Sequence, residues 1–408
     1  MSASKLQAVQ EARPARGKAT SPPPEAFHDA PAAEVIRVLE DFTSQWSAPE
    51  AVIRDNADLA RRLRKELKQL PAWDDALRAR TLAKKVAQHR FGLPFKCNFE
   101  ISAVCPLQCE YCVLTKDSAL ARQRRKPLME WSDFEATWRY MEAFTTEVEF
   151  TGGEPLLNPK LFAMIREMNR AGVYSQVTTN AQLLTEADVE ELLDAQPTRI
   201  LIAYDSSEAR AYESTRRRGK LSRLNENIRR LSDCKRRSGN TQPEICLQMI
   251  VHRKNYMHVD RFWEEAEAMD VDAAAIKPVL IWPGRGEEYE RAMIRNYLVL
   301  EHPVSYHKLD ESGELVKLRQ PGVCPNVQNV VIGSGTEVIP CWYILLDTHV
   351  AGYAADTPFP EIWYGAAYRE YRRRMVEETV SPACPGCLGL NFDPALWQER
   401  SFRGEGHR

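Results

Sequence analysis

The sequence has no long apolar segment and almost no net charge. No apolar run approaches the ~20 residues that cross a bilayer, and the start, MSASKLQAVQEARPARGKATSPPPEAF, contains no apolar core typical of a secretory signal. Its 55 basic and 57 acidic residues give a formal net charge of −2, which favours neither nucleic acid nor an anionic membrane as a partner. We therefore expect a cytoplasmic protein with no nucleic-acid partner and no membrane partner.

A disulfide framework is not expected for the ten cysteines, because disulfides are rare in a reducing compartment. Clustered cysteines there are first interpreted as metal ligands or redox groups. Seven follow such a pattern: Cys105, Cys109 and Cys112 near the front, then Cys324, Cys341, Cys384 and Cys387 near the end. Cys97, Cys234 and Cys246 stand alone. We expect small buried hydrophobic residues at these three positions and assign them no role.

The 408 residues suffice for one large domain with an appendage. Residues 1–28 are rich in Pro, Ala and charge, which predicts a disordered tail. Residues 29–92 show apolar residues at helical spacing and predict a small helical preface. Its basic stretch LARRLRKELKQL is interpreted as a solvated face, with a docking surface as the alternative.

Short β-like runs alternate with amphipathic helices from residue 93 to 300, which predicts an α/β fold built on a partial (β/α)6 barrel, open on one side. The six runs are 99–104, 148–152, 174–179, 199–204, 244–251 and 272–279. Ser132 with Glu135 and, separately, Thr185 are expected to start helices, and Gly172 to end one. A ligand site should lie at the carboxyl ends of the strands.

The alternation breaks down after about residue 286, and residues 301–392 form a mixed region that holds the four late cysteines. It contains NVVIGSGTEVIPCW, which predicts a hairpin around the turn GSGT. Residues 393–408 are expected to be a second tail.

The stretch CPLQCEYC, residues 105–112, places three thiols in one tight loop directly after the first β-run. Cysteine sulfurs delivered in this way can hold an iron-sulfur cube. The alternative is a zinc knuckle, which usually has four closed ligands on paired CxxC arms and fits CxxxCxxC poorly. Three ligands leave an open coordination position, to which another molecule can bind.

This CxxxCxxC motif after the first strand of a βα series resembles the radical S-adenosylmethionine (radical SAM) superfamily. The resemblance implies that Cys105, Cys109 and Cys112 hold a 4Fe-4S cluster, whose fourth iron binds the amino and carboxylate groups of S-adenosylmethionine. It also implies that Tyr111 lies against the adenine, with plain loop packing as the alternative for this residue.

Three further stretches resemble motifs of this superfamily. In GGEP, formed by Gly152, Gly153, Glu154 and Pro155, the resemblance assigns the glutamate to the amino group of S-adenosylmethionine. TTNAQLL places Asn180 in the cofactor pocket. AYDS, residues 203–206, departs from the family's SLDG, so the usual contact to the ribose or carboxylate would fall to Asp205, or to Ser206 and Arg216. A surface loop is the alternative, and RRRGK at 216–220 is interpreted as a solvated face.

Cys324, Cys341 and the CPGC at 384–387 supply four thiols in two arms, a full ligand set for one metal centre. A structural zinc site is one interpretation of this spacing. The surrounding sequence resembles the SPASM and twitch extensions of the superfamily, and the absence of cysteine after CPGC favours the twitch form with one auxiliary 4Fe-4S cluster. The resemblance implies an electron acceptor; a purely structural site is the alternative.

The resemblance therefore implies a radical SAM oxidoreductase, a dehydrogenase or bond-forming enzyme of a biosynthetic pathway. It would cleave S-adenosylmethionine reductively to a 5'-deoxyadenosyl radical, abstract a substrate hydrogen atom and oxidise a small natural product or peptide. A reducing flavodoxin or ferredoxin would donate electrons. No winged-helix-like segment is visible in the preface, which weakly disfavours a ribosomal peptide. The alternatives are a redox-neutral isomerase or adenosyl transferase with a structural second site, and a non-catalytic zinc protein. The pattern names no catalytic base.

Overall fold

The computed structural model describes residues 57–63, 75–112, 114, 124–279, 287–300, 305, 307–309, 311–312, 315–317, 325–341, 350–376 and 397–402. Predictions for the N-terminal tail, for much of the preface, and for Cys324, Cys384 and Cys387 lie outside these residues.

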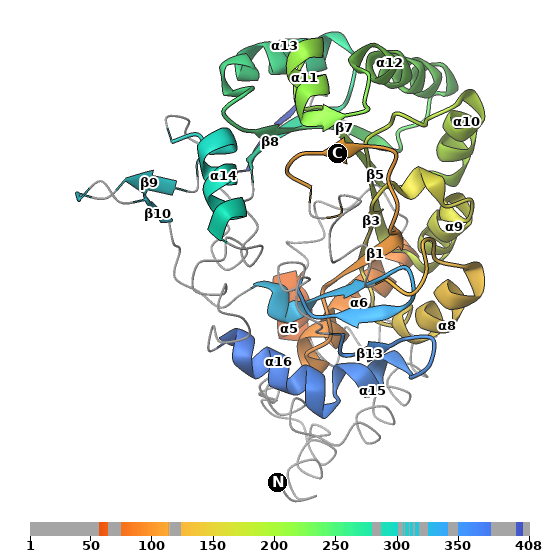
Figure 1. Cartoon of the computed structure of the whole chain (residues 1–408). Coiled ribbons are helices and arrows are strands. Elements are labelled where there is room, and N and C mark those ends of the chain that lie inside the picture. The colour runs from red at the N-terminus through yellow and green to blue at the C-terminus, as the bar shows by residue number, and fades with distance from the viewer. Residues whose placement is uncertain are drawn as a thin grey trace, which may run out of the picture.

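A ten-stranded sheet forms the centre of the molecule (Figure 1). Six of its strands are parallel and adjacent: β1 (Lys96–Ser102), β3 (Glu147–Gly152), β4 (Tyr174–Thr179), β5 (Arg199–Ala203), β7 (Glu244–Val251) and β8 (Ala273–Pro278). They correspond to the six predicted runs. β1 and β8 do not pair with each other, so the sheet stays open. The prediction of an α/β partial barrel is confirmed.

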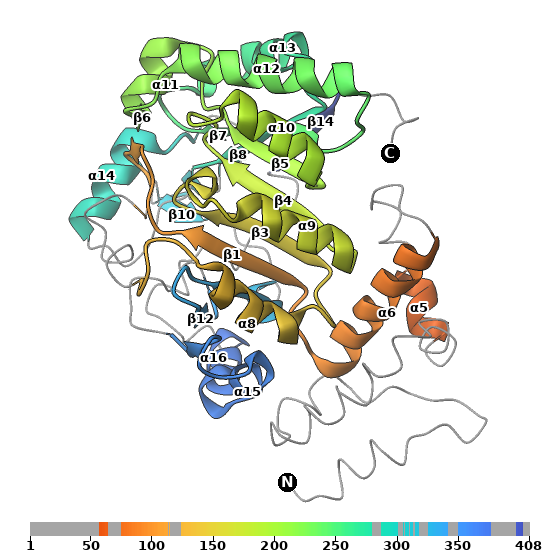
Figure 2. The same cartoon turned by 90° about the vertical axis from the view of Figure 1, so that its right-hand side faces the viewer.

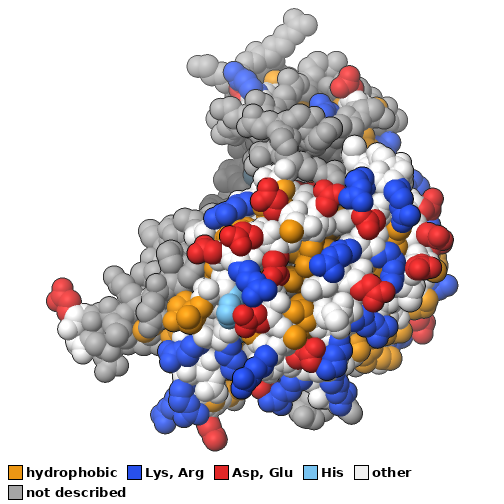
Figure 3. Space-filling view, turned by 90° about the horizontal axis from the view of Figure 1, so that it is seen from above, with side chains coloured by type: hydrophobic (Ala, Val, Ile, Leu, Met, Phe, Trp, Pro, Cys, Tyr) orange, Lys and Arg blue, Asp and Glu red, His pale blue; other side chains and the backbone are white. Residues whose placement is uncertain are grey.

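Helices cover the outer face of these strands (Figure 2). They are α8 (Trp131–Met141), α9 (Leu161–Ala171), α10 (Glu186–Ala195), α11 (Ala209–Thr215), α12 (Leu221–Ser238) and α13 (Val259–Ala268). On the face seen in Figure 3, Lys and Arg side chains are interspersed with Asp and Glu side chains, in keeping with the near-zero net charge. Among the described helices, none is both long enough and apolar enough to cross a bilayer.

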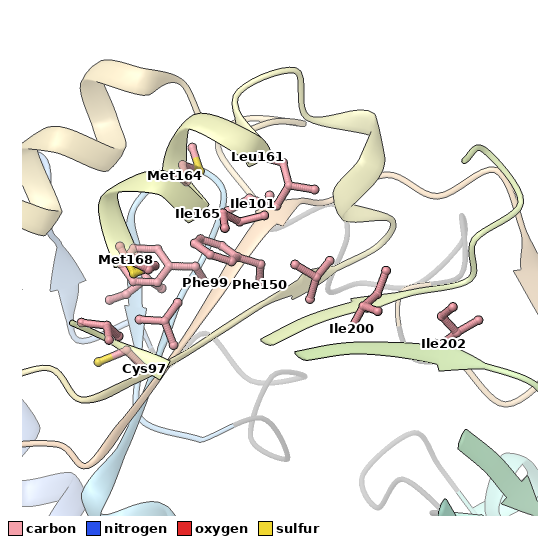
Figure 4. Packing of buried hydrophobic residues seen from close by; sticks show 14 of the residues in the cluster. Cys97, Phe99, Ile101, Phe150, Leu161, Met164, Ile165, Met168, Ile200 and Ile202 are labelled. Atoms are coloured by element: carbon pink, nitrogen blue, oxygen red, sulfur yellow. The ribbon is translucent and has the colours of Figure 1, made fainter. Parts of the chain in front are cut away.

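Alternate strand residues build the main core between sheet and helices. Phe99 of β1 and Phe150 of β3 are fully buried there, with ring centroids 6.3 Å apart, and Leu161 and Ile165 of α9 belong to the same core (Figure 4). The intervening strand residues face the inside of the barrel, so the concave face carries a separate set of side chains.

Two of the three predicted helix signals are confirmed. Thr185 caps α10 in a capping box with Asp188, and Gly172 ends α9 in the left-handed region, with φ 64°. The prediction at Ser132 is wrong, because α8 begins at Trp131 and its N-cap, Glu130, makes no side-chain hydrogen bond. Ser132 therefore lies within the first turn and cannot cap it.

The late strands extend both edges of the sheet, which the sequence analysis did not predict. β11 (Asn329–Ile332) pairs in parallel with β1 and forms the predicted hairpin with β12 (Glu337–Ile339), to which β13 (Gly352–Tyr353) is added. At the other edge, β14 (Gln398–Ser401) pairs antiparallel with β8. This strand lies where we expected only a tail.

The preface contributes α5 (Ala57–Leu63) and α6 (Asp75–Phe91), and α6 packs against the barrel. The buried Lys84 donates from Nζ to the carbonyl oxygen of Ala171 at 2.8 Å, at the end of α9. Burial lowers the pKa of this lysine to about 7. The remaining helices and strands are α14 (Glu287–Tyr297), β9 (His307–Leu309), β10 (Leu315–Lys317), α15 (Phe359–Trp363) and α16 (Ala366–Val376), with β2 (Gln108–Cys109) and β6 (Arg216–Arg217) beside the site.

Candidate functional site

The loop after β1 carries the first three cysteines at the carboxyl end of the sheet, where the ligand site was expected. Within it, β2 pairs antiparallel with β6, so that Cys109 lies opposite Arg216. The backbone N–H of Glu110 also donates to the carbonyl oxygen of Thr215 at 3.0 Å. The cysteine loop is therefore fastened to the segment that follows α11.

Each of the three thiols has a nitrogen donor close by. The pairs are Asn180 Nδ2 with Cys105 Sγ at 3.6 Å, Arg216 Nη1 with Cys109 Sγ at 3.9 Å, and the Leu114 backbone nitrogen with Cys112 Sγ at 3.3 Å. Burial raises the pKa of Cys105 and of Cys109 to about 12. Because N–H donors stabilise anionic sulfur, this donor set fits thiolates that ligate a metal cluster.

The three thiols do not form a site for a single ion. Among the residues that the structure describes, no three His, Cys, Asp or Glu side chains converge closely enough to hold one metal ion. Thiolates that bind separate corners of a cube need not meet at one point, whereas the ligands of a zinc ion must.

The GGEP turn packs against the backbone that leads into the cysteine loop. A Cβ on Gly152, whose φ is +114°, would lie 2.2 Å from the Ser102 carbonyl oxygen, and one on Gly153 would lie 2.1 Å from that of Val104. Gly153 and Glu154 donate their backbone N–H groups to the same two carbonyls, at 2.7 and 2.9 Å. The glycines thus permit a close approach that fixes the backbone just before the first thiol.

Glu154 is fully buried and is held by several hydrogen bonds. Its Oε1 accepts from Thr179 Oγ1 at 2.5 Å and from the Leu156 nitrogen at 3.2 Å, and its Oε2 accepts from the Asn180 nitrogen at 2.9 Å. Burial raises the pKa of this carboxyl, although these donors oppose the shift. A carboxylate has about four acceptor positions, so an ammonium group can still be accommodated.

Pro155 and Asn180 complete this side of the site. Pro155 begins a short 3-10 helix (Pro155–Leu157) directly after the glutamate. Asn180, at the end of β4, joins Glu154 to Cys105 through its backbone nitrogen and its side chain. Residues predicted from three separate motifs are thereby brought into contact.

Asp205, at the end of β5, is fully buried on the opposite side of the cysteine loop. Its Oδ2 accepts from the hydroxyl of Tyr111 and from Arg216 Nε at 2.6 Å, and its Oδ1 accepts from the Ile250 nitrogen at 2.9 Å. Burial alone would raise the pKa of Asp205, but the Arg216 guanidinium holds it below its usual value. Tyr111, predicted to face a cofactor ring, is fixed by this carboxylate.

The interpretation of RRRGK as a solvated face is wrong for its first residue. Arg216 is buried because it neutralises Asp205 in the interior. Arg217 does lie on the surface, where its side chain is 63% exposed and pairs with Glu110. The basic run therefore combines one buried ion pair with one surface ion pair.

Three residues beside Tyr111 were missed by the sequence analysis. His252 and Tyr297 pack against the Tyr111 ring with centroid separations of 5.7 and 5.9 Å, and Asn255 Nδ2 donates to the Asp205 carbonyl oxygen at 2.6 Å. Burial lowers the pKa of His252 to about 4. His252 and Asn255 belong to the stretch VHRKN at the carboxyl end of β7. This position could have marked them as candidate site residues, because ligand sites lie at the carboxyl ends of the strands.

The β11–β12 hairpin holds the far end of the cysteine loop. The buried Glu337 accepts from the Arg125 backbone nitrogen at 2.7 Å and from that of Gly335 at 2.9 Å. Arg124, beside it, forms a buried ion pair with Glu100 of β1. Cys341 follows β12 and is also buried, with Met375 of α16. Of the four predicted ligands of the second centre, it alone lies within the described residues.

Two family models match this chain. The model of the radical SAM superfamily matches residues 99–260, and that of the SPASM iron-sulfur cluster-binding domain matches residues 324–388. The first match contains the cysteine loop, GGEP, Asn180 and Asp205. The chain therefore contains a radical SAM domain followed by a SPASM domain.

Several curated proteins resemble this radical SAM chain. The PqqA peptide cyclase of Bradyrhizobium diazoefficiens is 31% identical over 119 residues, which are 29% of this chain and 30% of that protein. The tungsten-containing aldehyde ferredoxin oxidoreductase cofactor-modifying protein of Pyrococcus furiosus is 22% identical over 323 residues, covering 71% of this chain and 85% of that protein. The match to the PqqA peptide cyclase therefore spans only 30% of the length of that protein.

Two solved structures share the fold. Streptococcus suis SuiB bound to S-adenosylmethionine has a TM-score of 0.55 at 16% identity, covering 83% of this chain and 82% of SuiB. Native anSMEcpe with bound AdoMet has a TM-score of 0.51 at 17% identity, covering 73% of this chain and 88% of the other. The cofactors of this radical SAM protein are S-adenosylmethionine and a 4Fe-4S cluster, with iron-sulfur also in the SPASM domain.

Proposed function

We propose that this radical SAM enzyme oxidatively modifies a peptide, with an auxiliary 4Fe-4S cluster as the electron acceptor. The match to a PqqA peptide cyclase carries the peptide assignment, and a structure of SuiB bound to precursor peptide SuiA, with a TM-score of 0.55, supports it. This proposal departs from the sequence analysis, in which the lack of a winged-helix-like segment weakly disfavoured a ribosomal peptide. The electron donor, a flavodoxin or ferredoxin, and the cytoplasmic location stay predictions.

Cys105, Cys109 and Cys112 are proposed to hold the cluster that binds S-adenosylmethionine. When bound, these cofactors supply abstraction of a hydrogen atom from an unactivated C–H bond. The chain itself positions the reactants. Glu154 and Asn180 would receive the amino end of S-adenosylmethionine, and Gly152 and Gly153 bring this turn close to the cysteine loop.

Tyr111 and Asp205 are proposed to form the opposite wall of the cofactor site. Asp205 already accepts three hydrogen bonds from the protein, so we propose that it acts through Arg216 and Tyr111 rather than as the main ribose contact. Fixing these two side chains in advance reduces the entropy lost when S-adenosylmethionine binds.

The second centre is proposed to comprise Cys324, Cys341, Cys384 and Cys387 and to hold one cluster, as in the twitch form. Four thiolates would leave no open iron for substrate, which suits a redox role. The alternative is a redox-neutral isomerase or adenosyl transferase with a structural second site.

The function is tested with anaerobically reconstituted enzyme, S-adenosylmethionine, a reductant and a library of short peptides. We expect 5'-deoxyadenosine together with a peptide product that is lighter by about 2 Da, the mass of the two hydrogens lost in one dehydrogenation or bond formation. A product of unchanged mass would support the redox-neutral alternative, and modification of small metabolites without any peptide product would overturn the peptide assignment.

The Glu154 assignment has its own test. Glu154→Gln keeps the size of the side chain but removes the charge, so we expect S-adenosylmethionine to bind roughly tenfold more weakly, the usual loss when a charge-assisted hydrogen bond is weakened. The exposed Glu190→Gln of α10 is the matched control. Equal binding by both variants would place the amino group elsewhere.

A further inference from the structure

Lys277 of β8 faces the inside of the barrel. Ala274 and Ile276 of this strand belong to the main core between the sheet and the helices, whereas Ala273 and Ala275 pack on the other face with the partly buried Trp397. Lys277 continues this inner row because alternate residues of a strand point to the same side. Its Nζ lies 5.8 Å from the centroid of the Trp397 ring.

Within the described part of the chain, the ammonium of Lys277 has no carboxylate within 4 Å, and no hydrogen bond to it is found. The two carboxylates whose charges act on it are already engaged. Glu149 binds Lys96 Nζ and Thr178 Oγ1, both at 2.8 Å, and Asp205 binds Arg216. Burial lowers the pKa of Lys277. The barrel interior thus holds a half-buried cation without its own counter-ion.

Gln248 of β7 presents a second unused donor on the same face. Its side chain is buried, and its Nε2 has no hydrogen-bond partner. In the sheet register Gln248 lies between Ala203 of β5 and Ala275 of β8, and Lys277 is two residues beyond Ala275. Because Ala203 and Ala275 are short, the long polar side chains of this part of the inner face are those of Gln248 and Lys277.

The patch lies next to the cofactor site. The register partner of Lys277 is Ile250, whose backbone nitrogen donates to Asp205 Oδ1. Trp397, the residue just before β14, covers the other end of the row. A group bound by Lys277 would therefore be held inside the barrel, close to Asp205.

We propose that Lys277 and Gln248 form a carboxylate-binding subsite that recognises an acidic group of the peptide substrate. The Lys277 ammonium can only donate hydrogen bonds, and the Gln248 Nε2 group is a donor that has no acceptor partner in the structure. A carboxylate, which only accepts, can bind both groups. The carboxylate can belong to an Asp or Glu side chain or to a peptide C-terminus. This inference rests on the proposed function for its substrate class, but the subsite itself can be tested without turnover.

The experiment measures lysine accessibility in the anaerobic holoenzyme with S-adenosylmethionine bound. Reductive methylation followed by mass spectrometry gives the labelling rate of Lys277, with the exposed Lys160 as the internal reference. The probes are N-acetylglutamate N-methylamide for a side-chain carboxylate, N-acetylalanine for a terminal carboxylate, and N-acetylglutamine N-methylamide as the neutral match. We expect one of the carboxylates to slow labelling of Lys277 roughly tenfold, as befits a charge-assisted contact, and the neutral match to leave it unchanged.

Variants separate recognition from packing. Gln248→Leu should reduce the protection several-fold, and Lys277→Arg should retain a preference for acidic over neutral peptides in binding assays, whereas Lys277→Met should lose that preference without loss of S-adenosylmethionine binding. Equal protection by the neutral match, no protection by either carboxylate, or no labelling of Lys277 without a probe would each overturn the proposal. Protection without any peptide product would retain the subsite and remove the proposed function. Peptide modification without protection of Lys277 would support the proposed function and overturn the subsite.

Discussion

Asp205 and Arg216 form a buried ion pair, with Arg216 Nε 2.6 Å from Asp205 Oδ2. The pair joins the carboxyl end of β5 to β6, which in turn pairs with the cysteine loop at Cys109. Arg216 Nη1 also lies 3.9 Å from Cys109 Sγ. One guanidinium therefore stabilises an interior carboxylate and fixes the position of a proposed cluster ligand.

We expect Asp205→Asn to destabilise the protein by about 3–5 kcal/mol, because it leaves the Arg216 charge buried without a partner. Urea unfolding at neutral pH measures this change. Glu110→Gln, which weakens the ion pairs of this carboxylate with Arg217 and Lys254, should cost less than about 1 kcal/mol. Similar losses in the two variants would mean that Arg216 is compensated by other groups.

Gly153→Ala should impair the cofactor site rather than the fold as a whole. Its Cβ would lie 2.1 Å from the Val104 carbonyl oxygen, so the backbone directly before Cys105 must shift. We expect S-adenosylmethionine affinity to fall by roughly tenfold or more, because a displaced loop misplaces several contacts together.

Gly239→Ala is the control for the glycine variant. Gly239 has a φ of +71° and open space around its Cβ position, so its replacement introduces backbone strain at the end of α12 far from the cysteine loop. Isothermal titration with S-adenosylmethionine compares the two. Unchanged affinity in Gly153→Ala would contradict the tight packing of this turn.

The parts of the structure that could be predicted from the sequence are those set by local pattern. Strand β7 occupies the predicted residues 244–251, because a short, mostly apolar run between turn signals has few other solutions. Contacts between distant segments could not be predicted this way. Arg216 looked like part of a surface run because its partner, Asp205, is fixed only by the fold.

The same reason explains the late strands and the interior donors. β11 joins β1 across more than 200 residues, and no local pattern specifies such a pairing. Lys277 and Gln248 each lie within an apolar β-run, and only the register of β7 and β8 shows that they share the inner face. The motif residues could be proposed in advance because their spacing is itself the signal, whereas their hydrogen-bond partners depend on tertiary packing.

His252 should make stability fall in mildly acidic solution. Its pKa is lowered to about 4 in the folded protein, first by burial, against about 6.5 in the unfolded chain. The folded state therefore binds its proton less readily, and the stabilisation present above pH 6.5 is lost as the pH falls from 6.5 towards 4, by about 1.4 kcal/mol per pH unit. The charged groups that act on the ring are Asp205, Lys254 and Arg216.

Unfolding free energies at pH 7.5 and 5.5 test this prediction. We expect the wild-type protein to lose about 1.4 kcal/mol more than His252→Gln between these values. His258→Gln serves as the control, since His258 is partly exposed at the end of a short 3-10 helix (Tyr256–His258). A wild-type slope equal to that of His252→Gln would show that the imidazole titrates normally.

Cys341→Ala separates the two metal centres. Cys341 is buried beside Met375 and follows the hairpin that holds the end of the first cysteine loop, so its loss should remove the auxiliary cluster while the first remains. Reconstituted wild-type protein should contain about eight irons per chain and the variant about four. Cys234→Ala, which removes a half-buried lone cysteine, should retain the wild-type content.

The catalytic consequence of this variant distinguishes the two roles of the second centre. If the auxiliary cluster accepts an electron, Cys341→Ala still cleaves S-adenosylmethionine but yields no oxidised peptide, and 5'-deoxyadenosine accumulates without product. If the second centre is only structural, product formation and 5'-deoxyadenosine decline together with the stability of the fold, and the ratio of the two stays that of the wild type. The ratio is informative even when the total activity is low, because both compounds come from the same folded molecules.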